Sequence, residues 1–274
     1  MVSKCLNSGV GQIDDLERAL HEALVRNEFV LQYQPYLDLV TQKIAGVEAL
    51  IRWQHPAYGL IYPDHFIFCA ERSSLITSIG EWVLQQACLQ LSQWCALEID
   101  IPCMSVNVSP RQFSEISLSK FVQTVLATNN LSPDRLDLEI TESAMPTDQE
   151  KMSVNINQLR ELGVKISIDD FGMGYSSLER LRIMQVDRLK IDRIFISGLA
   201  LNPNDACLVR SMIHLAQQLG LSVIAEGIED AEACVRLQAM GCHEGQGFYF
   251  TPALGASDCA QYLRDVQHAH KQRL

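Results

Sequence analysis

Short apolar runs recur along this chain, and nearly every one carries or ends in a polar side chain. These polar residues are Glu48, Asn107, Glu139, Asp169, Asp170, Lys190, Glu226 and Gln246. A strand built from Val, Ile and Leu is typical of a parallel sheet that is buried on both faces. Burying an ionisable group there costs several kcal/mol unless the group meets a metal ion or an opposite charge. The pattern therefore predicts one site that holds a cation at one rim of a parallel barrel.

The spacing of these runs predicts the fold class. Eight strand-like segments alternate with stretches of helical length, at residues 29–39, 44–53, 103–108, 135–140, 164–168, 188–191, 222–225 and 247–250. Eight strands with intervening helices in about 250 residues are typical of a (β/α)8, TIM-like barrel. An open doubly wound sheet is the alternative, but such a sheet concentrates its chemistry at one switch point. Polar residues at most strand ends favour the barrel.

The connection between the first two strands is too short for a crossover helix. Only residues 40–43 separate them, so we expect a hairpin with an antiparallel first strand. Helices are expected over 14–27 and 79–95, and after Pro110, Pro146, Pro203 and Asp230. No linker divides the chain. We therefore expect one barrel domain over 14–268, a tail or linker remnant over 1–13, and a C-terminal tail over 269–274.

Composition excludes several classes of protein. Hydrophobic residues make up 47% and charged residues 20%, and no apolar stretch is long enough to span a membrane. We therefore expect a cytoplasmic location and no membrane contact by this domain. The net charge of −11 argues against polymeric nucleic acid as a partner. The nine cysteines include no C-x-x-C pair, so we expect reduced thiols and neither a zinc site nor a disulfide framework.

The strongest local signal is the pair Asp169-Asp170 at the end of an apolar strand. Two adjacent carboxylates repel each other and stay ionised when cations lie beside them, so metal binding explains them best. In residues 44–53, the period of two puts Glu48 and Arg52 on one face, either as an internal ion pair or as a metal ligand beside a phosphate-binding guanidinium. Lys190 either extends to solvent or, near the carboxylates, helps to hold a metal-bound water or a developing oxyanion.

These motifs resemble those of a known family, the EAL domain, which comprises bacterial phosphodiesterases of cyclic di-GMP. The family is named after the tripeptide seen here as Glu48-Ala49-Leu50, and the resemblance covers roughly residues 14–262. Further matching motifs are Tyr33-Gln34-Pro35, Val106-Asn107-Val108-Ser109, Leu138-Glu139-Ile140-Thr141-Glu142, Asp169-Asp170-Phe171-Gly172, Lys190-Ile191-Asp192, Glu226-Gly227-Ile228-Glu229 and Gln246-Gly247. Their number and order make a chance match implausible.

The resemblance implies a two-metal site that uses Mg²⁺ or Mn²⁺ to hydrolyse cyclic di-GMP to linear pGpG. One ion would be held by Glu48, Asn107, Glu139 and Asp169, and the other by Asp169, Asp170 and Glu226. Lys190 would hold the attacking water, Gln246 would support the site, and Glu142 would brace the loop after Asp170. Gln34, Arg52 and Glu229 would contact substrate. The resemblance also implies a homodimer and fused or partner sensory or GGDEF modules.

The chain departs from the family pattern at three positions. Met173, Ser74 and Gln185 stand where Thr, Gly and Pro are common, and none of them is a proposed ligand. A catalytically weak cyclic-di-GMP receptor is the first alternative function, but receptors of this family generally lack one or more of the metal-binding carboxylates. A barrel that abstracts a proton from a carboxylic acid substrate, as in enolases, is the second, and it leaves the Asp169-Asp170 pair unexplained. The complete ligand set favours the enzyme.

Overall fold

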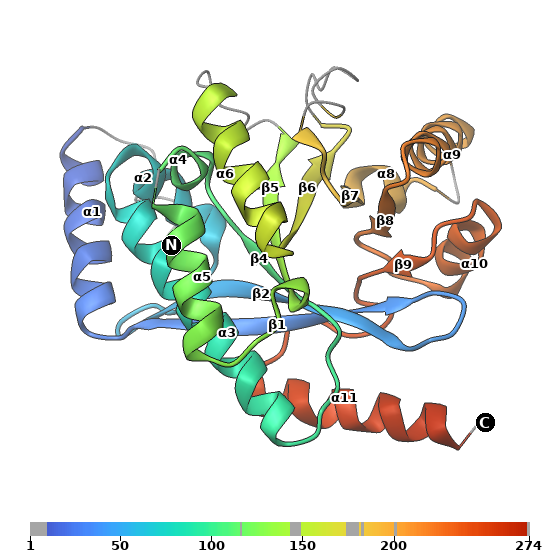
Figure 1. Ribbon diagram of the computed structural model, residues 1–274, viewed down its shortest axis with the longest axis horizontal. Coiled ribbons are helices and arrows are strands. Elements are labelled where there is room, and N and C mark those ends of the chain that lie inside the picture. The colour runs from blue at the N-terminus through green and yellow to red at the C-terminus, as the bar shows by residue number, and fades with distance from the viewer. Residues whose placement is uncertain are drawn as a thin grey trace.

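A closed ring of eight strands forms the centre of the fold (Figure 1). The computed structural model describes residues 10–115, 117–142, 149–173, 181, 184–199 and 202–272. Within them the strands are β1 Phe29–Asp38, β2 Ile44–His55, β3 Gly59–Ile61, β4 Met104–Asn107, β5 Leu136–Thr141, β6 Lys165–Phe171, β7 Arg188–Ile191, β8 Ser222–Ala225 and β9 Glu244–Gly245. The order around the ring is β1-β9-β8-β7-β6-β5-β4-β2, and β1 pairs back with β2. β3 extends the sheet outside the ring at β2.

Strand β1 runs antiparallel to both of its neighbours, and the remaining pairs around the ring are parallel. Gln34 lies opposite Glu48 in the β1–β2 register. Asp38 closes the hairpin, because its carboxylate accepts hydrogen bonds from the backbone N–H groups of Val40 and Thr41. The predicted (β/α)8-like barrel with an antiparallel first strand is thus confirmed.

Helices surround the ring and alternate with the parallel strands. They are α1 Val10–Val25, α2 Ile67–Arg72, α3 Leu75–Ala96, α4 Pro110–Phe113, α5 Leu118–Thr128, α6 Gln149–Leu162, α8 Arg193–Ser197, α9 Pro203–Gln218, α10 Ala231–Ala239 and α11 Ala256–Lys271, with 3-10 turns at Pro63–His65 and Pro133–Arg135. Side-chain caps begin several of them: Asp192, Asn202 and Asp230 accept backbone hydrogen bonds at the starts of α8, α9 and α10. Helix α11 packs along β1 (Figure 1).

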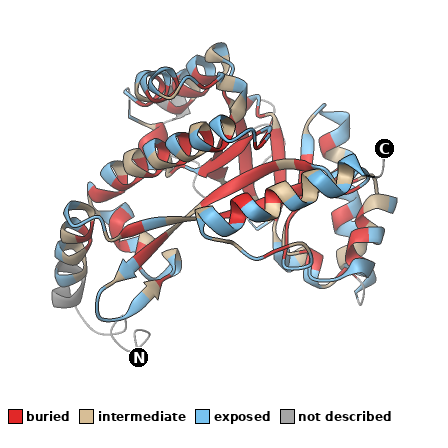
Figure 2. Cartoon of the chain, turned by 90° about the horizontal axis from the view of Figure 1, so that it is seen from below, coloured by how far each residue is buried: buried red, intermediate tan, exposed pale blue. Residues whose placement is uncertain are grey.

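The core lies inside the ring and between the ring and the helices. Figure 2 shows the strands largely buried at the centre of the fold, whereas the helices are exposed on their outward faces. All four residues of β7 are buried, as expected for a strand that is covered on both faces. No helix in the described ranges is both long and apolar enough to cross a bilayer.

The last predicted strand, 247–250, is wrong. Strand β9 is Glu244–Gly245, and residues 247–250 form a turn. Phe248 and Tyr249 are 71% and 45% exposed, so this apolar run is not a buried strand. Gly247 packs so closely on the backbone of Ile228 that a Cβ would lie 2.1 Å from the Ile228 carbonyl oxygen, and this contact turns the chain there.

The helix boundaries differ from the expected ones by about one turn. Helix α3 begins at Leu75 rather than at residue 79, and α1 begins at Val10 rather than at residue 14. At the other end α11 continues to Lys271. Residues 146–147, where a helix was expected to start, lie outside the described residues, and α6 begins at Gln149.

Candidate active site

The predicted polar residues meet at the carboxyl ends of the parallel strands. Each strand of the ring contributes to this group, directly or through the residue that follows it: Gln34 from β1, Glu48 from β2, Asn107 from β4, Glu139 from β5, Asp169 and Asp170 from β6, Lys190 from β7, Glu226 after β8 and Gln246 after β9. In this fold the carboxyl ends of the strands form the face that carries active sites. Residues separated by up to 212 positions thus come into contact.

Lys190 lies at the centre of this group and is 1% exposed. Its Nζ is 2.7 Å from Glu139 Oε2 and 2.7 Å from Glu226 Oε1. The same nitrogen is 3.2 Å from Asp169 Oδ1 and 3.4 Å from Glu48 Oε2. Burial opposes the charged form, but the four carboxylates raise the pKa of Lys190 well above its ordinary value. Lys190 is therefore an ammonium shared by four strands.

Amide side chains fix the orientation of Glu48. Asn107 Nδ2 donates to Glu48 Oε1 at 2.8 Å, and Gln246 Nε2 donates to Glu48 Oε2 at 2.8 Å. Gln246 Nε2 also donates to Gln34 Oε1 at 3.0 Å, and Gln34 Nε2 donates to the Thr251 carbonyl at 3.0 Å. Burial raises the pKa of Glu48, but Lys190 and these amide donors outweigh burial and lower it overall. Glu48 therefore stays ionised.

Asp169 and Asp170 reach the same site although they are neighbours in a strand. Adjacent strand residues normally point to opposite faces. Here the β6–β7 register is irregular between Ile168 and Phe171, and Asp170 has a left-handed φ of 53°. This local distortion turns Asp170 toward the barrel mouth. As a result, carboxylate oxygens of Asp169, Asp170 and Glu226 lie within 4.8 Å of one another.

Burial and mutual repulsion make several of these carboxylates hard to ionise. Burial, followed by the charge of Asp169, raises the pKa of Asp170 to about 6. Burial raises the pKa of Glu226 to about 8 and that of Glu139 well above its usual range, although Lys190 opposes both shifts. A divalent cation would replace these protons, because metal ligands must be deprotonated.

The donor set fits a hard divalent cation. Five carboxylates face the single ammonium of Lys190 within the described part of the chain: Glu48, Glu139, Asp169, Asp170 and Glu226. Among the described residues, the buried atoms Glu139 Oε1 and Gln246 Oε1 accept no hydrogen bond. Oxygen atoms of carboxylates and amides are the protein ligands that Mg²⁺ prefers, and Mn²⁺ accepts the same atoms. The group is thus a possible acidic metal site.

Glu142 follows β5 and contacts the segment after Asp170. Its Oε2 accepts a hydrogen bond from the Gly172 backbone N–H at 2.7 Å. Gly172 has a φ of 102°, which favours glycine. A Glu142 side chain that braces the loop after Asp170 would make a hydrogen bond of this kind. The rest of that loop, residues 174–177, lies outside the described residues, and Met173 is 57% exposed.

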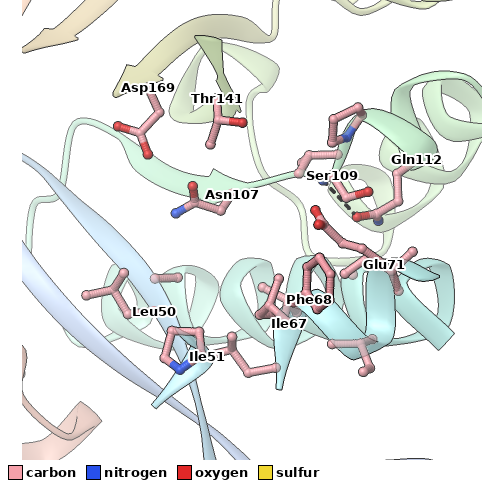
Figure 3. A pocket seen from close by; sticks show the side chains of 18 of the residues that line it. Leu50, Ile51, Ile67, Phe68, Glu71, Asn107, Ser109, Gln112, Thr141 and Asp169 are labelled. Atoms are coloured by element: carbon pink, nitrogen blue, oxygen red, sulfur yellow. Dashed lines mark hydrogen bonds between the residues drawn. The ribbon is translucent and has the colours of Figure 1, made fainter. Parts of the chain in front are cut away.

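An open pocket of about 490 Å³ extends from the carboxylates across the barrel rim (Figure 3). Asn107, Thr141 and Asp169 lie at its strand side. Ile67, Phe68 and Glu71 line it from α2, and Leu50 and Ile51 line it from β2 (Figure 3). Phe68 is 67% exposed, and burial raises the pKa of Glu71. The pocket combines an apolar wall with carboxylates.

The predicted substrate contacts lie in three different places. Gln34 belongs to the amide network around Glu48. Arg52 is 6% exposed and lies beside the pocket: its Nε donates to Gln32 Oε1 at 2.8 Å, and its guanidinium lies 4.8 Å from the centre of the Tyr62 ring. Glu229 lines a second pocket of about 750 Å³. Asp170 borders both pockets, so they meet at the carboxylate group.

Some residues of this region were not predicted as site residues. Thr141 lines the pocket opposite Asp169 in the β5–β6 register. The period of two along β5 marks Thr141, because it shares a face with Glu139. Phe68 and Glu71 lie on the six-residue helix α2. A helix this short has no periodicity that could mark them in advance.

Comparisons with known proteins identify similar chains. The EAL domain family matches residues 17–253. A bifunctional diguanylate cyclase/cyclic di-GMP phosphodiesterase, MucR of Pseudomonas aeruginosa, is 41% identical over 89% of this chain and 36% of its own length. A cyclic di-GMP phosphodiesterase of the same organism, PA2567, is 37% identical over 90% of this chain and 42% of its own length. The chain therefore spans about two fifths or less of the length of these curated relatives.

Solved structures have the same fold. The MucR phosphodiesterase in complex with cyclic di-GMP superimposes with a TM-score of 0.85 and 40% identity, covering 89% of this chain and 99% of that one. The EAL enzyme Bd1971, in a form with cAMP and cyclic di-GMP bound, has a TM-score of 0.89 and 34% identity over 94% of this chain and 70% of that one.

Proposed function

Because the chain belongs to the EAL domain family, we propose that it is a divalent-metal-dependent phosphodiesterase that hydrolyses cyclic di-GMP to linear pGpG. This reaction would lower the level of the second messenger. One observation carries the proposal: five carboxylates and the Lys190 ammonium converge at the mouth of a pocket whose other wall is apolar. Binding a substrate of this kind needs a local cation, because the substrate is anionic and the chain carries a net charge of −11.

Two ions of Mg²⁺ or Mn²⁺ would share the carboxylates. Glu48, Asn107, Glu139 and Asp169 would hold one ion, and Asp169, Asp170 and Glu226 would hold the other. Such a pair supplies an activated water at neutral pH and stabilises charge on the leaving oxygen. The unpaired Glu139 Oε1 and the three oxygens within 4.8 Å of one another support this assignment.

The remaining polar residues would orient water and ligands. Lys190 would donate a hydrogen bond to the attacking water, since its ammonium already lies among the carboxylates. Gln246 would hold Glu48 in place through the 2.8 Å hydrogen bond that it donates. Glu142 would fix the loop after Asp170 through Gly172. Each of these contacts limits motion at a reacting group.

The two pockets that meet at Asp170 suit a dinucleotide. A phosphodiester at the carboxylates would place one nucleotide in each pocket. In the first pocket, the exposed Phe68 ring offers a stacking surface for a base, and Arg52 would contact a phosphate from beside it. Glu229 would contact the nucleotide in the second pocket, and Gln34 would contact substrate near Gln246.

The wider context is also part of the proposal. We expect a homodimer, with the loop after Asp170 and its adjoining helix at the interface. We expect regulation by sensory or GGDEF modules, fused or separate, because the curated relatives are much longer than this chain. A substrate that is a soluble second messenger agrees with a cytoplasmic location, without contact of this domain with membranes or polymeric nucleic acid.

A hydrolysis assay tests the proposal. Purified protein is incubated with cyclic di-GMP and Mn²⁺ or Mg²⁺, with and without EDTA, and nucleotides are separated by chromatography. We expect pGpG to form, EDTA to stop the reaction, Glu48→Ala to be inactive, and Glu232→Ala on the exposed surface of α10 to match the wild type. Intact cyclic di-GMP under all conditions would refute the proposal. Binding without turnover that is insensitive to EDTA would instead indicate a receptor.

A further inference from the structure

A second layer, made of polar side chains together with Gly46, lies in the barrel directly beneath the active site. Its members precede active-site residues by two positions in their strands: Gly46 before Glu48, Ser105 before Asn107, Asp137 before Glu139, Ser167 before Asp169, Arg188 before Lys190, and Glu244 before Gln246. In the antiparallel β1 the order reverses, and Tyr36 follows Gln34. Because residues two apart share a face of a strand, both layers point into the barrel, roughly 7 Å apart.

Arg188 contacts side chains on four other strands, three of them through members of this layer. Its Nη1 donates to Asp137 Oδ2 on β5 at 2.9 Å and to the Tyr36 hydroxyl on β1 at 3.1 Å. Its Nη2 lies 2.9 Å from Glu244 Oε2 on β9, and its Nε donates to Ser222 Oγ on β8 at 3.1 Å. The side chain is 8% exposed. A planar guanidinium with donors along three edges is suited to a junction of this kind.

Asp137 is the fully buried partner of Arg188. It is 0% exposed, and both of its carboxylate oxygens lie 2.7 Å from Ser167 Oγ on β6. On the neighbouring strand β4, Ser105 is the register partner of Asp137, and its Oγ lies 3.3 Å from the Tyr36 hydroxyl. The layer leaves no spare room there, because a Cβ on Gly46 would lie 2.1 Å from the Tyr36 hydroxyl. The layer is therefore tightly packed as well as hydrogen-bonded.

Stability alone does not account for such a network. Replacing a buried ion pair and its partners by apolar side chains of similar size is often neutral or stabilising. An ionic network differs from an apolar core in its directionality, because each hydrogen bond fixes the position of both partners. Here the fixed strands are those that carry Glu139, Lys190 and Gln246 into the layer above.

We propose that Arg188 and Asp137 are positioning residues of the active site. They fix the register and height of β5 and β7 so that Glu139 and Lys190 stay at a distance of 2.7 Å and present the remaining carboxylate oxygens to a cation. The inference rests on the proposed metal site, because metal binding is the property that the layer controls. Removing a group that supports a metal ligand commonly lowers metal affinity or activity by roughly 10–100-fold.

The test measures Mn²⁺ binding without substrate, by isothermal titration calorimetry. The apolar triple variant Asp137→Leu/Arg188→Met/Glu244→Leu should give a circular dichroism spectrum and a cooperative unfolding transition like the wild type. Its Mn²⁺ affinity should be about 10–100-fold weaker. Arg188→Lys should bind Mn²⁺ with an affinity between those of the wild type and the triple variant, because lysine keeps the positive charge but lacks the planar guanidinium with its several donors. Arg236→Met is the matched control, since Arg236 pairs with Glu232 on the exposed face of α10.

Each outcome decides. A folded triple variant that binds Mn²⁺ like the wild type overturns the proposal. If the triple variant does not fold, Arg188→Lys decides in the same way: weakened binding supports the proposal and wild-type binding overturns it. A wild type that binds no Mn²⁺ overturns it too. If the wild type binds Mn²⁺ but leaves cyclic di-GMP intact, the proposed function fails, while weaker Mn²⁺ binding by the variants still supports the positioning role.

Discussion

Replacing Lys190 by methionine probes the electrostatics of the site most severely. The change keeps a long side chain in the buried position but removes the ammonium that lies within 2.7–3.4 Å of four carboxylates. In the absence of divalent metal, the carboxylates would lose this counter-charge. Breaking a buried ion pair by removing one partner typically costs about 3–5 kcal/mol.

This cost can be read as a change in melting temperature. In a domain of this size, a loss of about 1 kcal/mol in the free energy of unfolding lowers the melting temperature by about 2–4 °C. Metal-free Lys190→Met should therefore melt roughly 6–20 °C below the wild type. The difference should grow as the pH rises and more of the carboxylates ionise, and it should be smaller in acid, where protons replace the missing charge. Added Mn²⁺ should restore much of the loss, because a cation bound only to the native state stabilises it.

The assay is thermal unfolding in EDTA and in Mn²⁺, followed by circular dichroism. Lys120→Met is the control, because Lys120 is exposed on α5. The Lys120→Met variant should have the same melting temperature as the wild type in both buffers. If metal-free Lys190→Met also melts with the wild type at pH 8, the ammonium does not balance the carboxylates and the electrostatic reasoning is refuted.

Three further predictions concern the same site. Glu48→Ala should abolish turnover and leave the fold intact, because it removes a ligand and little core packing; normal hydrolysis by this variant would show that the metal assignment is wrong. In EDTA, the raised pKa values of Asp170, about 6, and Glu226, about 8, predict that the free energy of unfolding falls as pH rises through this range, since the protonated carboxyls stabilise the fold below it. Denaturant unfolding at several pH values checks this, and Mn²⁺ should remove the trend; a flat profile in EDTA contradicts it. Glu142→Ala should lower kcat about 10–100-fold by removing a charge-assisted hydrogen bond worth about 1.5–3 kcal/mol to Gly172, and Glu142→Gln should retain more activity. Equal rates for the two Glu142 variants would exclude a brace that depends on an acceptor at this position.

The barrel and the gathering of its site residues follow from the sequence for a physical reason. Parallel strands must be buried on both faces, so a polar residue such as Glu139 or Lys190 in an apolar run indicates a shared polar centre. The hairpin between β1 and β2 follows from the short connection between the two strands alone. In contrast, the position of β9 depends on the contact between Gly247 and the Ile228 backbone, which local sequence does not encode.

The layer beneath the site could not be predicted from the sequence of any single strand. The period of two puts Asp137 on the same face as Glu139, but it does not identify Arg188 as its partner 51 residues away. Gln185 is another such case. Its φ of 47° is inaccessible to the proline that is common at this position in the family, so the backbone here departs from the pattern in a way that composition does not reveal.

The most direct measurement follows Mn²⁺ binding and cyclic di-GMP hydrolysis in the same samples. Bound Mn²⁺ is obtained from the loss of the free-ion signal in electron paramagnetic resonance, and pGpG formation is measured in parallel for the wild type and Asp169→Asn. We expect the rate to rise as two ions bind per chain, and Asp169→Asn to bind fewer ions and to be inactive. Full-rate hydrolysis without bound Mn²⁺, or in Asp169→Asn, would contradict the assignment of this carboxylate cluster as the metal-dependent active site.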